Sequence, residues 1–341
     1  MSGRRGMAIW LTVGLAFGAA CLWWSLRRVP WQDLDVEFRR ARYWLLPPFL
    51  GLLAVFYWLK AVRWRLLLLP LKPMSTRDVA GPLMVGFMAN NLFPAHLGEF
   101  IRVFVIGRTQ RISRSAVFSS VVLERLFDMV AILMWLGIGL MAGGGLQPEY
   151  RQAAVLVALT TVLLLSAAGA FVVWPERFVT MLDRVLRWWF PPTWRKRLVD
   201  MLRSGVDGMQ VLRRPRLAAG VVVTSLLQWL VMALMAWVSL WAFGQQEQWA
   251  ASFVVVGVIA VAILAPAPPG YVGFIQALFV AVLGLYGVRE PVALAASVFF
   301  HVGQFVPVTL VGLWYLKRMG LSLREVRAAG DDVSPESSGA G

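Results

Sequence analysis

Long apolar runs alternate with short polar segments along most of the chain. A helix needs about 20 apolar residues to cross the hydrocarbon core of a bilayer. Six runs reach that length, and we expect each of them to form a full transmembrane helix: 7–26, 43–63, 116–143, 152–174, 217–243 and 291–316. The pattern therefore predicts an all-α polytopic membrane protein.

The first of these runs, 7–26, also has the basic start of a signal peptide, and residues 18–21 loosely resemble a lipoprotein cleavage site. The run is longer than the apolar core of a typical signal peptide. We therefore expect a retained helix, in which Gly14 and Gly18 are spaced for close packing against a neighbour.

Two further apolar regions are interrupted. Region 80–107 is broken by several polar residues, a proline and a glycine between positions 90 and 99, and region 251–287 is broken by the prolines and the glycine at 266–270. Each half is about 12–18 residues long, which is marginal or too short for a full crossing. These two regions therefore need a different arrangement from the six continuous runs.

Composition supports the membrane class and excludes others. Hydrophobic residues make up 59% of the chain and charged residues only 15%, whereas soluble domains carry about 25% charged residues. A soluble enzyme, a disordered scaffold and a disulfide-rich secreted module are therefore not expected, and Cys21, the single cysteine, cannot form an intrachain disulfide. The net charge of +15, from 33 basic and 18 acidic residues, needs a separate explanation.

The distribution of the basic residues predicts the topology. Twenty-five of the 33 lie in the two terminal segments and in the loops 60–78, 100–115 and 175–216, and seven lie in the other loops. The positive-inside rule places the larger group, with both termini, in the cytoplasm. Loop 27–44 is an exception to this rule, because it has five arginines, although three acidic residues offset part of their charge.

This topology makes both interrupted regions re-entrant, because the loops that flank each of them lie on the same side. Region 80–107 enters from the cytoplasm and region 251–287 from outside, and their apices share the spacing Pro94-x-x-x-Gly98 and Pro269-x-x-x-Gly273. Paired interrupted segments of this kind indicate an inverted repeat with a site near the midplane. Irregular backbone at that depth must be buried in protein or line a wet cavity.

The expected fold therefore has six full transmembrane helices and two oppositely oriented re-entrant hairpins. They form a single transmembrane domain over 1–320, and a disordered cytoplasmic tail follows over 321–341. The amphipathic segment 175–216 carries interspersed arginines and tryptophans, so we expect a cytoplasmic elbow on an anionic lipid surface. Its apolar face argues against the alternative reading of its charge, nucleic-acid binding.

Several ionisable residues lie inside the predicted membrane segments, where each costs roughly 2.5–3.5 kcal/mol on insertion scales. Glu99 and Arg102 share a face of the first hairpin, and Glu124, Arg125 and Asp128 share a face of the next span. One hypothesis is a polar cavity in which Arg102 and Arg125 bind a phosphate. The alternative is a set of internal ion pairs that hold the helices together.

Other polar residues in the predicted membrane segments also have two possible roles. His301 and Gln304 lie on one face of the last span, where they either line the cavity or make packing hydrogen bonds, and Gln228 is expected to join helices. The chain has only two histidines, so we expect no His-rich metal site and no cofactor. The candidate cavity residues are Asn90, Asn91, Pro94, His96, Gly98, Glu99, Arg102, Glu124, Arg125, Asp128, Pro269, Gly270, Gly273, Gln276, His301 and Gln304.

Two motifs resemble signatures of the lysylphosphatidylglycerol synthase transmembrane-region family, whose members are also called flippase-like proteins. The first is Asn90-x-x-x-Pro94-x-x-x-Gly98-Glu99-x-x-Arg102, followed by Glu124-Arg125-x-x-Asp128, and the second is Pro266-x-x-Pro269-Gly270-x-x-Gly273. The resemblance covers about residues 7–320. It implies the transfer of a lipid or a lipid-linked head group between leaflets. The cytoplasmic positive charge and the lack of an organellar targeting signal predict a bacterial inner membrane.

The chain departs from the family pattern at two positions. Tyr271 stands where the family commonly has a second glycine, and Gln276 stands where it commonly has a glutamate, so the substrate or the coupling is expected to differ. Bifunctional relatives add a soluble aminoacyltransferase domain, which we do not expect here because the chain ends about 25 residues after its last span.

Three functions follow from these observations. The leading hypothesis is a lipid flippase or transporter for a phospholipid or a polyprenyl-linked lipid. The second is an integral membrane enzyme acting on a lipid or polyprenyl phosphate, with the carboxylates as acid and base, although the sequence has no H-E-x-x-H motif, no G-x-S-x-G motif and no carboxylate-rich external loop. The third is a non-transporting scaffold of a lipid-synthesis complex. A homo-oligomer is compatible with all three.

Overall fold

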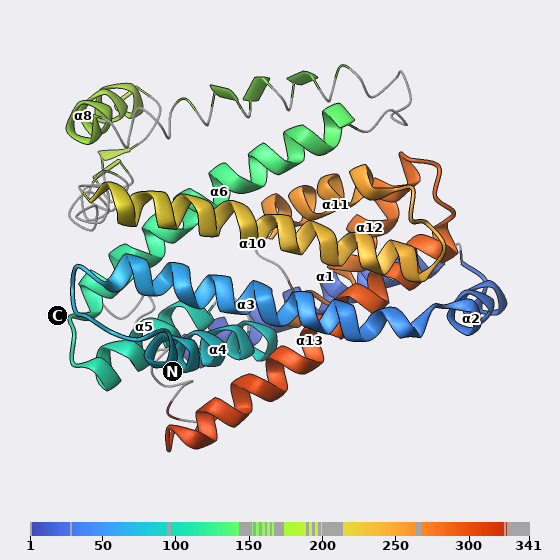
Figure 1. Cartoon of the computed structure of the whole chain (residues 1–341), viewed down its shortest axis with the longest axis horizontal. Helices are drawn as coiled ribbons and strands as arrows, with labels where there is room; N and C mark the ends of the chain where they lie inside the picture. Colours follow the sequence, from blue (N-terminus) through green and yellow to red (C-terminus); the bar gives the residue numbers. More distant parts are fainter. Residues whose placement is uncertain are drawn as a thin grey trace.

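The computed structural model describes residues 2–27, 29–93, 97–142, 174–188, 214–263 and 268–323, together with isolated positions among 152–199 and residue 325. Within these ranges the chain forms helices and no strand (Figure 1). The helices are α1 Ser2–Leu26, α2 Trp31–Arg40, η1 Tyr43–Leu45, α3 Leu46–Leu68, α4 Thr76–Leu92, α5 Leu97–Gln110, α6 Arg114–Ala142, α8 Pro175–Leu186, α10 Pro215–Ala242, α11 Trp249–Ala262, η4 Pro269–Tyr271, α12 Phe274–Gly284 and α13 Glu290–Arg318.

Three of the described helical segments are long and apolar enough to cross a membrane: Tyr43–Leu68, Pro215–Ala242 and Glu290–Arg318. α6, with 29 residues, and α1, with 25, are the other long helices of the described residues. An all-helical structure with such segments is that of a helical membrane protein. The expected span 152–174 lies outside the described residues, apart from isolated positions.

The helix expected to end at Arg63 is longer than predicted. α3 continues to Leu68, because the apolar run resumes directly after Arg65, so Lys60 and Arg63 lie within the helix rather than in the following loop. Both side chains are buried, as is that of Arg102. Three of the 25 residues counted as cytoplasmic loop charge therefore belong to the interior, which leaves 22 in that group.

Both interrupted regions fold as pairs of short helices. The first hairpin consists of α4 and α5 and the second of α11, η4 and α12, with helices of 17, 14, 14 and 11 residues. At 1.5 Å per residue they are about 17 to 25 Å long, shorter than the roughly 30 Å hydrocarbon core. Of the first apex, Pro94 and His96 lie outside the described residues.

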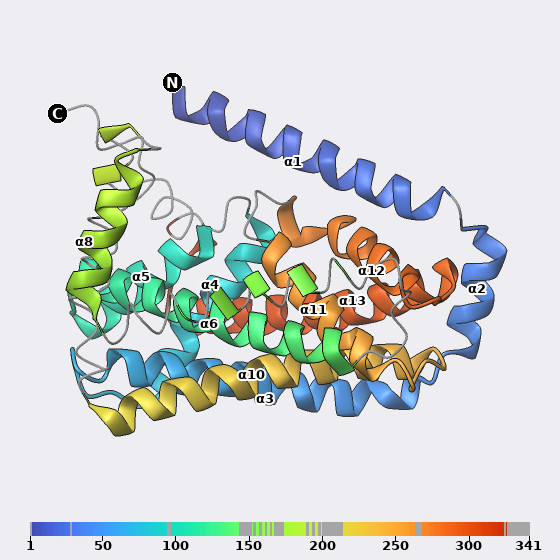
Figure 2. The same cartoon turned by 90° about the horizontal axis from the view of Figure 1, so that it is seen from above.

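The two hairpins occupy opposite halves of the long axis, and their apices meet near the middle (Figures 1 and 2). A Cβ placed on Gly270 of the second apex would lie 3.1 Å from the carbonyl oxygen of Asn91 in the first. The same Cβ would lie 2.8 Å from the ring of Phe305, and Gly270 has a positive φ of 62°, so this position favours glycine. The breaks in the two apolar regions thus come together in space.

Each hairpin also packs against a long helix of the opposite half of the molecule. The first helix of each hairpin packs on the long helix of the other half, α4 on α13 and α11 on α6. Glycines allow both contacts, because Gly312 of α13 lies against Met84 and Met88, and Gly139 of α6 lies against Ala250 and Phe253. α3 and α10 run side by side along the molecule (Figure 2). The first helices of the two hairpins thus make equivalent contacts in the two halves of the molecule.

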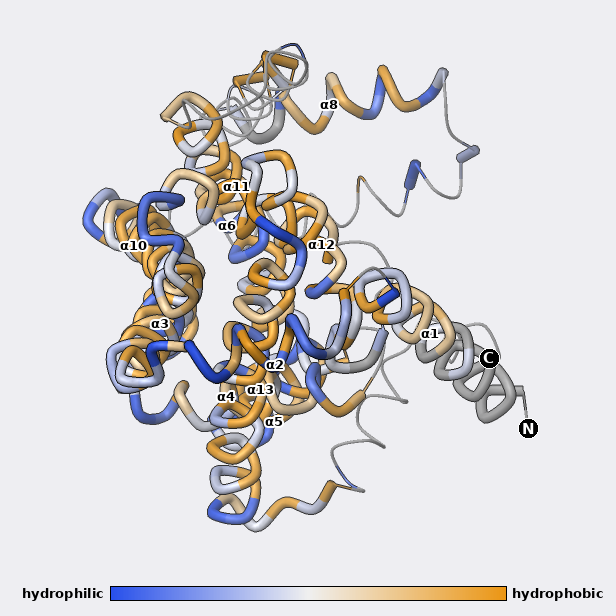
Figure 3. Tube along the Cα trace, turned by 90° about the vertical axis from the view of Figure 1, so that its right-hand side faces the viewer, coloured by the Kyte–Doolittle hydropathy of each residue, from blue (hydrophilic) through white to orange (hydrophobic). Residues whose placement is uncertain are grey.

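α1 packs on the second hairpin. A Cβ on Gly273 would collide with the backbone of Gly18, and Gly273 itself has a φ of 80°. The small residue at position 18 therefore contacts the hairpin apex rather than another long helix. Seen along the molecule, the helices are largely apolar, and hydrophilic stretches lie in α2 and the connecting segments (Figure 3).

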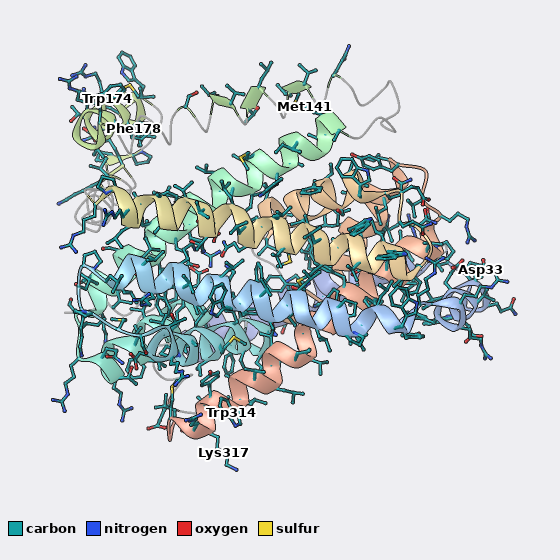
Figure 4. The ribbon with its side chains drawn as sticks, in the orientation of Figure 1. Asp33, Met141, Trp174, Phe178, Trp314 and Lys317 are labelled. Carbon is teal, nitrogen blue, oxygen red and sulfur yellow. The ribbon has the colours of Figure 1, made fainter. Side chains whose placement is uncertain are left out.

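The two ends of the molecule differ. At one end lies α8 with Trp174 and Phe178, and at the other lies α2 with Asp33 (Figure 4). α8 is strongly amphipathic, and the rings of Trp174 and Trp188 are exposed. α2 is joined to the start of α13 by an ion pair of 2.6 Å between Glu37 and Arg289.

Candidate functional site

A group of seven charged side chains lies between α3, α5 and α6, and is called the charge cluster below. Its members are one lysine, three arginines and three carboxylates: Lys60, Arg63, Glu99, Arg102, Glu124, Arg125 and Asp128. Helical spacing aligns them, because Lys60 and Arg63 are three residues apart on α3, and Glu124 and Asp128 are four apart on α6.

Arg63 is the centre of the cluster and is completely buried. Its Nη1 donates to Asp128 Oδ1 at 2.6 Å and its Nη2 to Glu124 Oε1 at 2.8 Å, so one guanidinium bridges both carboxylates. Nη2 also reaches Asp128 Oδ2 at 3.2 Å. The planar fork of arginine suits this bidentate geometry.

α10 completes the environment of Asp128. Gln228 Nε2 and Trp229 Nε1 donate to Asp128 Oδ1 at 2.5 and 2.7 Å, and Ser225 Oγ accepts from Arg63 at 3.1 Å. Gln228 therefore does join helices, and its partner is the charge cluster. Because a buried ion pair is stable only when its remaining hydrogen-bonding capacity is satisfied, these neutral donors help to stabilise the pair of Arg63 and Asp128.

Arg102 lies behind Glu124. Its Nη1 donates to Glu124 Oε2 at 2.9 Å, and its guanidinium stacks over the ring of Trp64 at 4.9 Å from the centroid. Its Nε and Nη2 are buried and have no hydrogen-bond partner among the described residues. Arg102 thus supports Glu124 from the side facing away from the cavity described next.

A cavity of about 490 Å³ opens beside the cluster, within the size range of ligand sites. Its charged end is formed by Lys60, Glu99, Arg125 and Asp128, and the amides of Asn90, Asn91 and Gln304 with His301 and Tyr271 add polar groups. The rest of its wall is apolar and comes mainly from α6, α10, α11 and α13: Met129, Ile132, Leu133, Met232, Val256, Ile259, Ala260, Val261, Ile263 and Val308.

Arg125 is the arginine that faces the cavity. Its side chain is 37% exposed, its Nη2 is 2.6 Å from Glu99 Oε1, and its Nη1 is 3.8 Å from Asp128 Oδ2. This pair joins α6 to the start of α5. The two arginines proposed from the sequence therefore have different places, with Arg125 on the cavity wall and Arg102 in the packing behind it.

An amide side chain closes the first apex. Asn90 Oδ1 accepts a hydrogen bond of 2.8 Å from the backbone N–H of Gly98 in the first turn of α5. Gly98 is also where α5 crosses α4, because a Cβ there would collide with the carbonyl of Gly86. Asn91 turns to α13 and donates to Thr309 Oγ1 at 3.0 Å.

The second apex is closed in the same way. Gln276 Oε1 accepts from the backbone N–H of Gly273 at 2.8 Å, and Gln276 Nε2 lies 3.0 Å from His301 Nδ1. His301 Nε2 lies 2.8 Å from the carbonyl oxygen of Gly270. Since a carbonyl only accepts, Nε2 carries the proton and Nδ1 accepts from Gln276, which defines a neutral histidine.

Tyr271 occupies the position at which the similar family commonly has a second glycine. It lines the cavity and has a φ of 59°, a conformation that non-glycine residues seldom adopt. The backbone of this apex thus keeps a shape suited to glycine, while the tyrosine ring occupies part of the cavity wall. Backbone strain of this kind is often retained at functional sites.

The sequence-predicted residues therefore fall into separate sets. Seven line the cavity, four shape the apices without lining it, Arg102 and Glu124 lie behind it, Pro269 lies in η4, and Pro94 and His96 lie outside the described residues. The seven are Asn90, Asn91, Glu99, Arg125, Asp128, His301 and Gln304, and the four are Gly98, Gly270, Gly273 and Gln276.

Sequence reasoning missed Lys60, Arg63 and the contributions of α10. A signal was present, because the leucines that follow Arg65 extend the apolar run and place Lys60 and Arg63 well inside it, one turn apart. In the described parts of the chain, no three His, Cys, Asp or Glu side chains are grouped as metal ligands.

Two comparisons with known proteins found matches to the chain. A family model described as the lysylphosphatidylglycerol synthase TM region matches residues 11–312. The chain is also similar to the protein named glycosyltransferase AglD from Haloferax volcanii, with 28% identity over 288 residues, 74% of this chain and 45% of that protein. The chain thus spans about half the length of this curated relative.

No solved structure matches the chain. The family match, in contrast, includes both hairpins, the charge cluster and most of α13, and so covers the whole candidate site. The chain therefore belongs to the lysylphosphatidylglycerol synthase TM region family.

Proposed function

We propose that this protein is a lipid flippase or transporter that moves a phospholipid or a lipid-linked head group between the leaflets of a bacterial inner membrane. One observation carries the proposal: a single cavity has a charged end beside the meeting point of the two hairpins and an apolar wall over the rest of its length. This division matches an amphiphile with a polar head group and apolar chains.

The topology that goes with this function has six full crossings, two re-entrant hairpins and cytoplasmic termini. The short helices of both hairpins, their location in opposite halves and the excess of basic loop residues support it (Figure 2). In this arrangement the charged end of the cavity lies near the membrane midplane. The amphipathic α8, with its exposed tryptophans, rests on the cytoplasmic lipid surface.

The proposed mechanism uses the contacts between each hairpin and the opposite half of the molecule. Each hairpin contacts the long helix of the other half, so a movement of one half against the other changes the cavity walls from both sides at once. The head group occupies the charged end, and the chains remain against apolar side chains or lipid. When no head group is bound, Glu99 pairs with Arg125 and Asp128 pairs with Arg63.

A second candidate function is supported by the name of the archaeal relative, a glycosyltransferase. In this alternative the chain is an integral membrane enzyme acting on a lipid or polyprenyl phosphate. Turnover of a polyprenyl-phosphate sugar by the purified protein, without a change in lipid distribution, would favour it over transport.

Reconstitution into liposomes with a fluorescent phospholipid tests the transporter. We expect faster transfer to the outer leaflet than in protein-free vesicles, and a loss of that acceleration in Ile132→Trp, because Ile132 lines the apolar wall. Ile138→Trp is the matched control, since Ile138 lies on the outer surface of the same helix.

Both variants must elute as a single folded species for the comparison to count. If the wild-type protein accelerates no lipid class, the transporter proposal fails. If Ile132→Trp and Ile138→Trp transport equally well, transfer does not use this cavity.

A further inference from the structure

Lys60 occupies an unusual position in the charge cluster. Its Nζ lies 3.9 Å from Glu124 Oε1 and 4.0 Å from Asp128 Oδ2, beyond the usual range for a hydrogen bond. Lys60 makes no hydrogen bond with the described residues. The ammonium instead lies over the rings of Phe56 and Phe87, at 5.2 and 5.3 Å from their centroids, and forms part of the cavity wall.

The carboxylates nearest to Lys60 are already occupied. Glu124 uses one oxygen for Arg63 and the other for Arg102. Asp128 accepts from Arg63 through both oxygens and also from Gln228 and Trp229. The Lys60 ammonium thus lies at the cavity, while the neighbouring carboxylates accept hydrogen bonds from other side chains.

The charges of the cluster do not balance. Four cations face three carboxylates among the described residues, which leaves one net positive charge in a largely buried group. An uncompensated charge away from water is costly, and His301, held neutral by its two hydrogen bonds, adds none. A ligand with one negative charge at the cavity would remove the imbalance.

Two cations, Lys60 and Arg125, and two carboxylates, Glu99 and Asp128, line this end of the cavity. Lys60 on α3 makes no hydrogen bond with the described residues, and Arg125 on α6 is partly exposed to the same cavity. Donors that converge from two helices suit a tetrahedral anion, whose oxygens accept in several directions. The adjoining apolar wall suits the hydrocarbon part of the same molecule.

We infer that the charged end of the cavity is a binding site for a phosphate with one net negative charge, such as a phosphodiester, with the Lys60 ammonium as its main anchor and Arg125 as the second. The inference rests on the proposed function for the lipid nature of the ligand. It adds the chemical class of the head group and a residue that binds it. A free phosphate ion shares this chemistry, and the experiment separates the two sources.

Native mass spectrometry on the purified full chain in detergent tests the site. The probes are phosphatidylglycerol, phosphatidylcholine and diacylglycerol with the same acyl chains, a fatty acid, and inorganic phosphate. We expect phosphatidylglycerol to bind at least about tenfold more tightly than the zwitterionic and phosphate-free lipids, which corresponds to about 1.4 kcal/mol. Lys60→Met should abolish this preference, and Lys60→Arg should restore most of it.

Lys72→Met is the matched control, because it removes the same charge from an exposed lysine whose Nζ donates to the carbonyl of Gln110, away from the cavity. Thermal unfolding without added lipid provides a second readout. Lys60→Met should melt at or above the wild-type temperature, because methionine fits against the two aromatic rings and the cluster becomes neutral. A lysine needed only for folding would give a lower melting temperature.

The outcomes separate this site from the transporter. Preferential binding that is lost in Lys60→Met supports the site even if no lipid is transported, which would defeat the proposed function alone. Transport that is indifferent to head-group charge and to Lys60→Met overturns the site and leaves the transporter intact. Equal binding of the fatty acid overturns the assignment to phosphate, and equally tight binding of inorganic phosphate supports the site and assigns it to a soluble ligand.

Discussion

The two halves of the molecule share a scaffold and differ in chemistry. In each half a glycine at the end of a Pro-x-x-x-Gly motif donates its backbone N–H to an amide side chain at 2.8 Å, Gly98 to Asn90 and Gly273 to Gln276. In each half a 29-residue helix follows the hairpin. The closure of the apices is therefore repeated, although the residues that supply the amides come from different helices.

The polar groups on the two 29-residue helices are not repeated. α6 carries two carboxylates and an arginine, all within the charge cluster, whereas α13 presents a neutral histidine and an amide. One half thus supplies charge to the cavity and the other supplies a neutral hydrogen-bonded wall. Duplication of a backbone arrangement does not require duplication of its chemistry, because the apices are held by backbone and amide groups that carry no charge.

The largest expected loss of stability comes from removing the central cation of the charge cluster. Arg63→Met leaves Glu124 and Asp128 without their shared partner in the interior, so we expect a loss of about 3–5 kcal/mol and little folded protein. The yield of monodisperse protein and its thermal unfolding measure this. Lys60→Met, which removes a cation without such partners one turn away, should not destabilise the protein. Equal damage by both would contradict the assignment of Arg63 as the centre.

The shared scaffold is tested by the paired glycines. Gly98→Ala and Gly273→Ala each place a methyl group against backbone, and Gly273 also has a positive φ, so we expect each to cost about 1–3 kcal/mol. Gly137→Ala on α6 is the control, because no atom lies within 4 Å of its added Cβ. Thermal unfolding should show the two apex variants below the control, and an apex variant as stable as the control would contradict the repeat.

The amide closures sharpen the comparison further. Asn90→Leu and Gln276→Leu each remove the acceptor for a glycine N–H, with an expected cost of about 1–3 kcal/mol. Gln276→Leu should lie at the upper end, because it also removes the hydrogen-bond partner of His301 Nδ1. The measurement is again the unfolding temperature, and the order of the two variants is the result that matters. The reverse order would mean that the His301 contact contributes nothing.

The smallest effect concerns the start of the first hairpin. α4 begins with a capping box in which Ser75 and Asp78 exchange hydrogen bonds, whereas α11 begins without a side-chain cap. Hydrogen bonds from Ser75 lower the pKa of Asp78, so the cap contributes above the unfolded-state value of about 3.9 and is lost as the pH falls through the lower folded-state value.

Asp78→Ala should therefore cost about 0.5–1 kcal/mol at neutral pH, and proportionately less in acid. Faster hydrogen exchange of the first-turn amides of α4 is the direct measurement. No change in exchange there at neutral pH would show that the box is not formed in solution.

The sequence predicted much of the fold, and physical reasons explain where it failed. The break at each hairpin apex was readable, because proline, glycine and polar residues interrupt runs that are otherwise long enough to cross a bilayer. The end of α3 was misplaced, because Lys60 and Arg63 look like the charged start of a loop until their partners on α6 are known. Gln276 was expected to line the cavity, and instead it hydrogen-bonds to Gly273 and His301.

The sequence by itself determined the class of protein and the positions of its breaks, because membrane thickness and interruptions of apolar runs act along one dimension of the chain. Only the tertiary structure decided which cation pairs with which carboxylate. Arg102 lies behind Glu124, Arg63 bridges both carboxylates of α6, and Lys60 remains at the cavity wall. These pairings depend on how α3, α5, α6 and α10 pack, and they bring residues 162 positions apart, Arg63 and Ser225, into hydrogen-bond contact.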